Sequence, residues 1–214
     1  MNSSTKIPIA REGLKLIFAL ALLTIVLFLV KTAVTGFFLL AVTLFVAFFF
    51  RDPRREVPLE EKAVVAPADG KVVAIRDIHE QDYLRQDVKQ ISIFLSIFDV
   101  HVNRAPISGV VESVKYNPGK FHIAALDKAS LENEQTSMTI AGENCRILVK
   151  QIAGIIARRV ICYLRPGDVI KKGDRYGLIC FGSRVDIFLP ADSEIKVAKG
   201  DRVKGARDII ATLG

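Results

Sequence analysis

Cysteine is scarce in this 214-residue sequence: Cys145, Cys162 and Cys180 are odd in number, widely spaced and without a Cys-x-x-Cys pair. Disulfide-stapled secreted domains carry even numbers of cysteines, and structural zinc sites use closely paired ones. The pattern therefore argues against a disulfide framework and against a metal site. It predicts buried thiols in a reducing compartment.

The sequence also lacks a basic helix and any basic patch interleaved with aromatic residues, although its net charge is +7. Proteins that bind nucleic acids gather their basic residues in such features. We therefore expect no nucleic-acid partner. The excess charge fits a solubilising surface or attraction to anionic lipid, where each basic residue beside a membrane contributes about 1 kcal/mol.

Two long apolar runs dominate the amino-terminal region, Leu14 to Val30 and Ala33 to Phe50, parted by Lys31 and Thr32. Each has about the minimum length for a helix that crosses a hydrocarbon core of about 30 Å. No small-residue cleavage pattern separates the runs, which argues against a signal peptide. Residues 1–50 are thus predicted to form a membrane-associated helical hairpin that spans the bilayer or dips into it.

Basic residues flank this hairpin on both sides, and basic flanks mark the cytoplasmic ends of membrane segments. They are Lys6, Arg11 and Lys15 before it, and Arg51, Arg54 and Arg55 after it. A charged link with two prolines follows at residues 51–62. We expect residues 63–214 to form a catalytic domain on the cytoplasmic side of the cell membrane.

From Ala63 onward, short β-branched runs alternate with glycine and proline, which is typical of strands joined by turns. Pro-x-x-Gly followed by valines occurs at Pro67 and again at Pro106, which suggests duplicated hairpins. The Gly-Asp turns in 164–174 resemble those of lipoyl and biotinyl domains. Helical periodicity is weak, except at 150–156. We predict a mainly β, antiparallel barrel-sandwich domain after the α-helical membrane hairpin.

Gly182-Ser183 interrupts two strand-like runs, 177–181 and 184–189. A serine hydroxyl beside an unhindered glycine carbonyl can, with a base, convert the peptide bond into an ester. Elimination would then leave dehydroalanine, and its hydrolysis a pyruvoyl group at position 183. A Gly-Ser pair by itself indicates only a bend between strands.

Several motifs together resemble the phosphatidylserine decarboxylase family, in its short bacterial and archaeal branch. They occur in the family's order along nearly the whole chain. They are Phe50-Arg51-Asp52-Pro53, Pro67-Ala68-Asp69-Gly70, the segment Phe94 to Pro106 with Asp99-Val100-His101-Val102-Asn103-Arg104, the segment Asp127 to Glu134, and Phe181-Gly182-Ser183.

The resemblance implies a pyruvoyl enzyme that decarboxylates phosphatidylserine in the membrane to phosphatidylethanolamine and CO2. It also implies self-cleavage into chains 1–182 and 183–214, which remain associated as a heterodimer; further dimerisation stays open. Family members use an Asp-His-Ser relay for this cleavage, matched here by Asp69, His101 and Ser183. The pyruvoyl cofactor, derived from Ser183, would condense with the amine of the lipid.

One position departs from the family pattern. Longer bacterial members carry two histidines three residues apart, whereas this sequence has His101 followed by Arg104. An arginine cannot act as a base at neutral pH because its pKa exceeds about 12, but it can bind carboxylate or phosphate. Either His101 serves both cleavage and decarboxylation, or the relay is assembled differently. Candidates for binding the lipid phosphate are Arg104, Lys120, Lys128 and Arg184.

Three other functions stay open on the sequence. The first is decarboxylation of archaetidylserine or a related serine phospholipid by the same chemistry. The second is a soluble pyruvoyl amino-acid decarboxylase, which the membrane hairpin disfavours. The third is a non-catalytic, membrane-tethered barrel-sandwich scaffold, in which Gly182-Ser183 would be an uncut bend.

Overall fold

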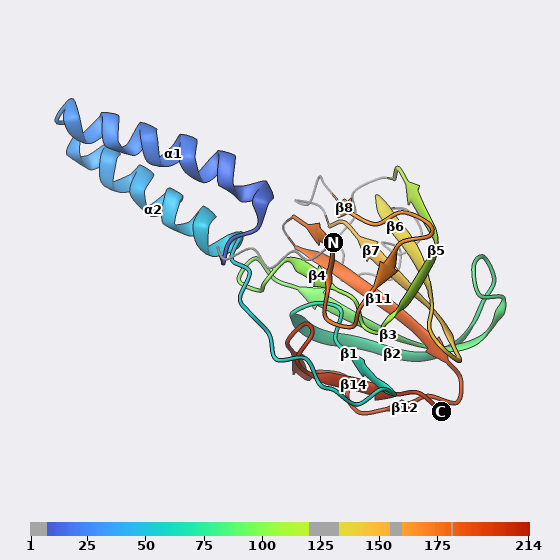
Figure 1. Ribbon diagram of the computed structural model, residues 1–214. Coiled ribbons are helices and arrows are strands. Elements are labelled where there is room, and N and C mark those ends of the chain that lie inside the picture. Colours follow the sequence, from blue (N-terminus) through green and yellow to red (C-terminus); the bar gives the residue numbers. More distant parts are fainter. Residues whose placement is uncertain (1–7, 120–132, 155–159, 181) are drawn as a thin grey trace. The chain divides into compact units, whose positions relative to one another are not determined.

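The computed structural model describes residues 8–119, 133–154, 160–180 and 182–214. The chain divides into two compact units, Met1–Arg54 and Arg55–Gly214 (Figure 1). The division falls inside the link that the sequence predicts at 51–62. Each unit is described separately below.

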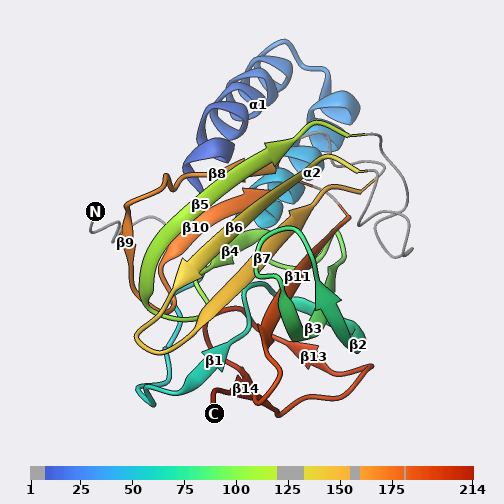
Figure 2. The ribbon, with the colours of Figure 1, turned by 90° about the vertical axis from the view of Figure 1, so that its right-hand side faces the viewer.

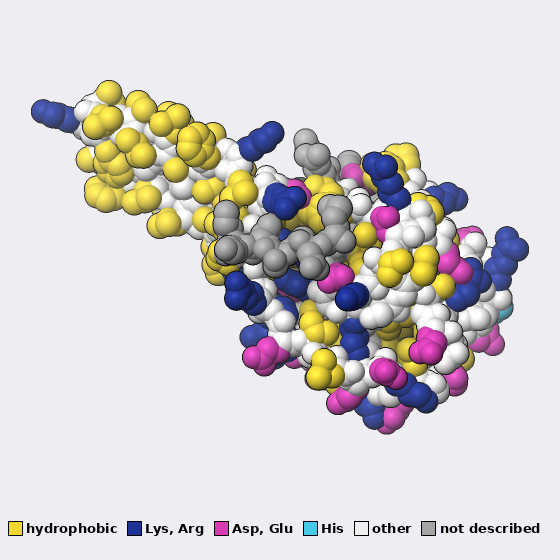
Figure 3. All heavy atoms as spheres, viewed as in Figure 1, with side chains coloured by type: hydrophobic (Ala, Val, Ile, Leu, Met, Phe, Trp, Pro, Cys, Tyr) yellow, Lys and Arg dark blue, Asp and Glu magenta, His cyan; other side chains and the backbone are white. Residues whose placement is uncertain are grey.

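The amino-terminal unit is a pair of helices, α1 (Arg11–Leu29) and α2 (Ala33–Phe49), which coincide with the two predicted apolar runs. The Thr24 and Thr43 hydroxyls lie 3.3 Å apart between the helices. Apolar side chains cover the outside of the pair (Figure 3). Among the described residues, α1 is long and apolar enough to cross a membrane, whereas α2 is shorter. This unit therefore supports membrane association.

The described part of the second unit forms one eight-stranded and two three-stranded sheets, and every strand pair is antiparallel. This confirms the mainly β, antiparallel prediction. In spatial order, the large sheet contains β13 (Arg202–Val203), β2 (Gly70–Glu80), β3 (Gln86–Leu95), β11 (Ser183–Pro190), β7 (Arg146–Ile152), β6 (Gln135–Ala141), β5 (Gly109–Asn117) and β9 (Val169–Ile170). One small sheet contains β1 (Ala63–Val65), β14 (Ile209–Thr212) and β12 (Glu194–Ile195). The other contains β4 (Val102–Arg104), β10 (Arg175–Ile179) and β8 (Val160–Cys162).

The chain passes repeatedly from a small sheet into the large one, and a glycine lies at each of these passages. The passages are β1 to β2 at Gly70, β4 to β5 at Gly109, β8 to β9 at Gly167, β10 to β11 at Gly182 and β12 to β13 at Gly200. The Asp69-Gly70 turn thus does not close a hairpin between β1 and β2, because these strands belong to different sheets. Gly182-Ser183 is one member of this recurring crossover.

The two Pro-x-x-Gly turns are equivalent in structure as well as in sequence. A Cβ atom on Gly70 would lie 2.3 Å from the carbonyl oxygen of Phe94, and one on Gly109 would lie 2.2 Å from that of Ala141. Both glycines are therefore required by the close approach of a neighbouring strand. The duplication suggested by the sequence is a repeat of this crossover.

The main hydrophobic core lies between one face of the curved large sheet (Figure 2) and the small sheets. Ile93 of β3, Val185 and Ile187 of β11, and Tyr176 of β10 are all buried in it. The helical pattern suggested for 150–156 is wrong at its start, because 150–152 form the end of β7; residues 155 and 156 lie outside the described part.

Truncating a side chain on β11 tests how far this strand anchors the core. Ile187 is fully buried, so Ile187→Ala should lower the free energy of unfolding by about 2–5 kcal/mol. The measurement is denaturant unfolding of the full chain in detergent, in a Ser183→Ala background that excludes the self-cleavage expected from the sequence. Val110→Ala is the control, since Val110 is 43% exposed. Equal losses in the two variants would contradict the role given to β11.

Candidate functional site

The start of β2, the end of β3 and the start of β11 meet at one end of the large sheet. Ser183 pairs with Leu95, and Lys71 pairs with Phe94, so Asp69 and Ser183 flank the end of β3 from opposite sides. Figure 2 shows these three strands next to one another. This end of the sheet collects two of the three predicted relay residues.

Ser183 is fully buried as the first residue of β11. Side chains alternate along a strand, so Ser183 shares the core face with Val185 and Ile187. Its hydroxyl has no hydrogen-bond partner among the described residues. Leaving a buried hydroxyl unpaired costs about 1–3 kcal/mol, so the position calls for a functional explanation.

Gly182 adopts a left-handed conformation, with φ at +51°. Within the described part of the chain, no heavy atom beyond its chain neighbours lies within 4 Å of the position that a Cβ would occupy. The glycine is thus favoured by the backbone conformation rather than by crowding. The peptide bond before Ser183 is consequently open on that side.

His101 lies between β3 and β4 and is 1% exposed. Its backbone carbonyl accepts a hydrogen bond of 3.3 Å from the N–H of Ile179, and the next residue, Val102, pairs with Leu178. These contacts hold His101 beside the end of β10, the strand that leads to Ser183. The third predicted relay residue is therefore fixed next to the same crossover.

The Asp69 carboxylate is held by two groups. Nη2 of Arg55 donates to Oδ2 at 2.7 Å and to Oδ1 at 3.0 Å, and the N–H of Gly205 donates to Oδ1 at 2.8 Å. Burial raises the pKa of Asp69, the Arg55 charge and these hydrogen bonds oppose it, and the charge of Asp99 adds to the rise. The net pKa lies above the ordinary value for aspartate.

Asp99 fixes the turn that leads from β3 to His101. Its Oδ2 accepts hydrogen bonds from the Ser96 backbone N–H at 2.8 Å and from the Ser96 hydroxyl at 2.7 Å. Its other oxygen lies 3.5 Å from Nη1 of Arg202. Asp99 is thus a positioning residue for the histidine-bearing segment.

Two buried carboxamides lie over the same face of the sheet. Nε2 of Gln151 donates to Oδ1 of Asn103 at 2.7 Å, and Gln151 pairs across the strands with Val185, two residues from Ser183. The amide nitrogen of Asn103 and the amide oxygen of Gln151 have no partner among the described residues. Buried polar atoms without a hydrogen-bond partner among the described residues therefore lie on the same face as Ser183, as is expected near a reactive site.

Of the four residues predicted to bind phosphate, the structure describes Arg184 and Arg104, and both contact groups of the protein itself. Arg184 points to the opposite face of β11 from Ser183, is 3% exposed and pairs with Asp186 at 2.9 Å. Gln90 also donates to Asp186, at 3.1 Å. Arg104 donates to the carbonyl of Gly173 at 3.1 Å. Lys120 and Lys128 lie outside the described residues.

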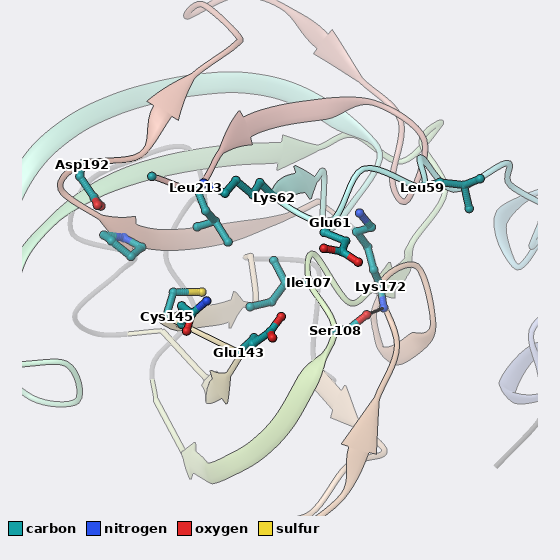
Figure 4. Close-up of a pocket in the computed structure, with 14 residues that line it drawn as sticks. Leu59, Glu61, Lys62, Ile107, Ser108, Glu143, Cys145, Lys172, Asp192 and Leu213 are labelled. Atoms are coloured by element: carbon teal, nitrogen blue, oxygen red, sulfur yellow. Dashed lines mark hydrogen bonds between the residues drawn. The ribbon is translucent and has the colours of Figure 1, made fainter.

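A cavity of about 480 Å³ lies elsewhere in this unit (Figure 4). Lys62, Cys145, Lys172 and Asp192 are among the residues that line it, and the relay residues are not. The cavity is therefore separate from the candidate site.

The sequence does not reveal the contacts made by the predicted relay residues. It marks Arg55 only as a membrane-flanking charge, and no motif singles out Gln151 or Gly205. A buried aspartate signals that a cation is needed nearby. It does not say which of many basic residues the fold brings to it.

Comparison with known proteins gives a consistent result. The family model for phosphatidylserine decarboxylase matches residues 42–211. A phosphatidylserine decarboxylase proenzyme from Syntrophotalea carbinolica is 49% identical over 96% of this chain and 97% of its own length. Proenzymes of the same name from Geobacter sulfurreducens and Geotalea daltonii are 46% and 43% identical, again over 96–97% of each chain.

The Arg184–Asp186 pair yields a test of stability. Arg184→Met leaves the Asp186 charge buried without its partner, which should lower the free energy of unfolding by about 3–5 kcal/mol. The double variant Arg184→Met/Asp186→Leu removes both charges and should recover most of the loss. Denaturant unfolding in the Ser183→Ala background measures both. If the double variant is as unstable as the single one, the pair does not act as a unit.

Proposed function

Since the chain belongs to the phosphatidylserine decarboxylase family, we propose that it matures by cutting itself between Gly182 and Ser183 and then works as a pyruvoyl-dependent phosphatidylserine decarboxylase. The observation that carries this proposal is the Ser183 hydroxyl. It is fully buried, without a partner among the described residues, and directly follows a left-handed glycine. The buried hydroxyls of Ser137 and Ser193 also lack a partner among the described residues, but neither serine follows a glycine.

Self-cleavage starts with attack of the Ser183 oxygen on the Gly182 carbonyl carbon. The new C–O bond forms, the Gly182–Ser183 C–N bond breaks, and the amine of residue 183 is freed. Elimination then releases the carboxylate of Gly182 and leaves dehydroalanine, whose hydrolysis releases ammonia and leaves the ketone. The hydroxyl and the carbonyl belong to adjacent residues of one chain, so the attack is intramolecular. This is the main source of its rate.

His101 takes the serine proton in this scheme, and Asp69 orients the imidazole and stabilises its protonated form. The backbone contacts of His101 with β10 and the turn built by Asp99 support this assignment, because both fix the histidine beside the crossover. His101 is the one histidine in the matched motif, so we propose that it also handles the proton of the decarboxylation step.

Decarboxylation of an amino acid needs an electron sink that no natural side chain offers, and a pyruvoyl carbonyl supplies it. The residues fit such a group, because the buried carboxamides of Asn103 and Gln151 offer hydrogen-bonding capacity on the same face as residue 183. Their burial would also keep water from the reacting centre.

The two products of cleavage would remain a heterodimer. β11, the first element of the 183–214 chain, is paired with β3 on one side and with β7 on the other, and both belong to the 1–182 chain. Separating the chains would break both ladders and expose the core face of β11.

We propose the inner face of the membrane as the place of reaction. The helical unit supports association with lipid, and the basic residues on both sides of it favour cytoplasmic ends. We propose phosphatidylserine rather than archaetidylserine as the substrate, because the matched relatives are bacterial enzymes named for phosphatidylserine.

Intact mass spectrometry of the detergent-solubilised protein gives the first test. We expect two chains, 1–182 and 183–214, with a blocked amino end on the second that borohydride modifies. Ser183→Ala should give one uncut chain without decarboxylase activity. Ser108→Ala, at an exposed serine, is the control and should be cut normally. An active, uncut Ser183→Ala protein would rule out the pyruvoyl mechanism.

Replacing the candidate base gives the second test. His101→Ala should slow self-cleavage by about 10²- to 10⁴-fold, because the serine loses its proton acceptor. The cut fraction is followed by gel electrophoresis after synthesis. His79→Ala is the matched control, since His79 is exposed and pairs with Asp87 at 2.7 Å. Normal cutting and turnover in His101→Ala would remove this residue from the site.

A further inference from the structure

We propose that Arg55 is a positioning residue for self-cleavage, which holds the Asp69 carboxylate ionised and in the orientation that His101 requires. This inference rests on the proposed function, in which Asp69 serves the relay. It gives the link after the membrane unit a part in maturation, beyond its basic charge beside lipid.

The contact between the two residues has the geometry of a strong ion pair. Nη2 of Arg55 reaches both oxygens of Asp69, at 2.7 and 3.0 Å, and the two side chains are only 10% and 12% exposed. Solvent therefore screens this pair less than it screens a surface pair. One guanidinium nitrogen bridges both oxygens, so the contact is a charge-assisted pair that holds the carboxylate from one side.

The pairing leaves room for the histidine. A carboxylate has about four acceptor positions. Among the described residues, Oδ1 accepts from Arg55 and Gly205, and Oδ2 accepts from Arg55. One position on Oδ2 is therefore left, and we assign it to the imidazole N–H of His101. The described contacts of Asp69 do not include His101, so this bond belongs to the proposed scheme, in which Arg55 would support it without competing for it.

The charges around Asp69 explain why it needs a cation. Burial and the negative charge of Asp99 both raise the pKa of Asp69, and Arg55 is the largest influence that lowers it. Arg207 also interacts with Asp69, but this side chain is exposed and paired with Asp208. Arg202 is paired with Asp99. Without Arg55, the pKa of Asp69 should therefore rise further.

The sign of the pH effect follows from this. A relay aspartate must be ionised to orient the imidazole and to stabilise its protonated form. If the pKa of Asp69 rises, the ionised form is lost at a higher pH as the solution is acidified. The acid limb of the cleavage-rate profile should move to higher pH, and cleavage should recover as the pH increases.

The experiment compares full-length chains made by cell-free synthesis with phospholipid vesicles, and follows the uncut fraction over time at a series of pH values. The variants are Arg55→Met, Arg55→Lys and the matched control Arg54→Met. Arg54 is the adjacent arginine and is exposed, so the control removes an equal charge beside the membrane. Asp69→Asn is included to test the relay itself.

We expect Arg55→Met to cut about 10- to 100-fold more slowly than wild type at neutral pH and to regain part of that loss at alkaline pH, where Asp69 is ionised again. The remaining loss reflects the lost orientation of the carboxylate. Arg55→Lys should be intermediate, and Arg54→Met should match wild type. Recovery with pH distinguishes the charge effect from misfolding, because a misfolded chain would not regain cleavage.

Three results would overturn the inference: Arg55→Met cutting like Arg54→Met at every pH, cutting faster than wild type, or showing no recovery as the pH rises. If Asp69→Asn is blocked in that experiment, the relay of the proposed function stands and only the role of Arg55 falls. If Asp69→Asn cuts normally, the relay assignment fails, and this inference fails with it.

Discussion

The pairing of β11 with β3 is the constraint on which the rest of the site depends. It places Ser183 opposite Leu95 and thereby brings the start of β11 to the end of the sheet where Asp69 lies. A slip of one residue would exchange the two faces of the strand and put Arg184 in the core. The register is held from both sides, by Val185 and Ile187 in the hydrophobic core and by Arg184 with Asp186 on the other face.

The two faces of β11 differ in whether their buried polar groups have partners. On the outer face, the Arg184 and Asp186 charges are matched, and Gln90 adds a further hydrogen bond. On the core face, the Ser183 hydroxyl has no partner among the described residues. A strand that satisfies one set of buried groups while leaving another unsatisfied concentrates its energetic cost at the proposed cleavage point. That distribution is expected where local stability is given up for chemistry.

Much of the fold could be read from the sequence because its signals are local. The helices follow from the apolar runs, although α1 begins at Arg11, before the first run, and the strands follow from β-branched residues between glycines. Which strands pair with each other could not be predicted from the sequence. The Asp69-Gly70 turn looks like that of a hairpin, but β1 and β2 belong to different sheets. The same limit applies to the site. Asp69 and His101 lie in recognisable motifs, whereas the contact of Arg55 with Asp69 depends on tertiary structure.

If the chain is cut as we propose, the central place of β11 makes unfolding of the mature protein harder to reverse. An uncut chain that unfolds can refold as a single molecule, since all its strands are connected. When a cut protein unfolds, its 183–214 chain separates and must find the 1–182 chain again by diffusion. The stability of the mature protein therefore depends on its concentration. In the proposed scheme, the ester and the amine of residue 183 have already been consumed, so the peptide bond cannot form again. The working lifetime of the enzyme is therefore set by its unfolding rate rather than by an equilibrium.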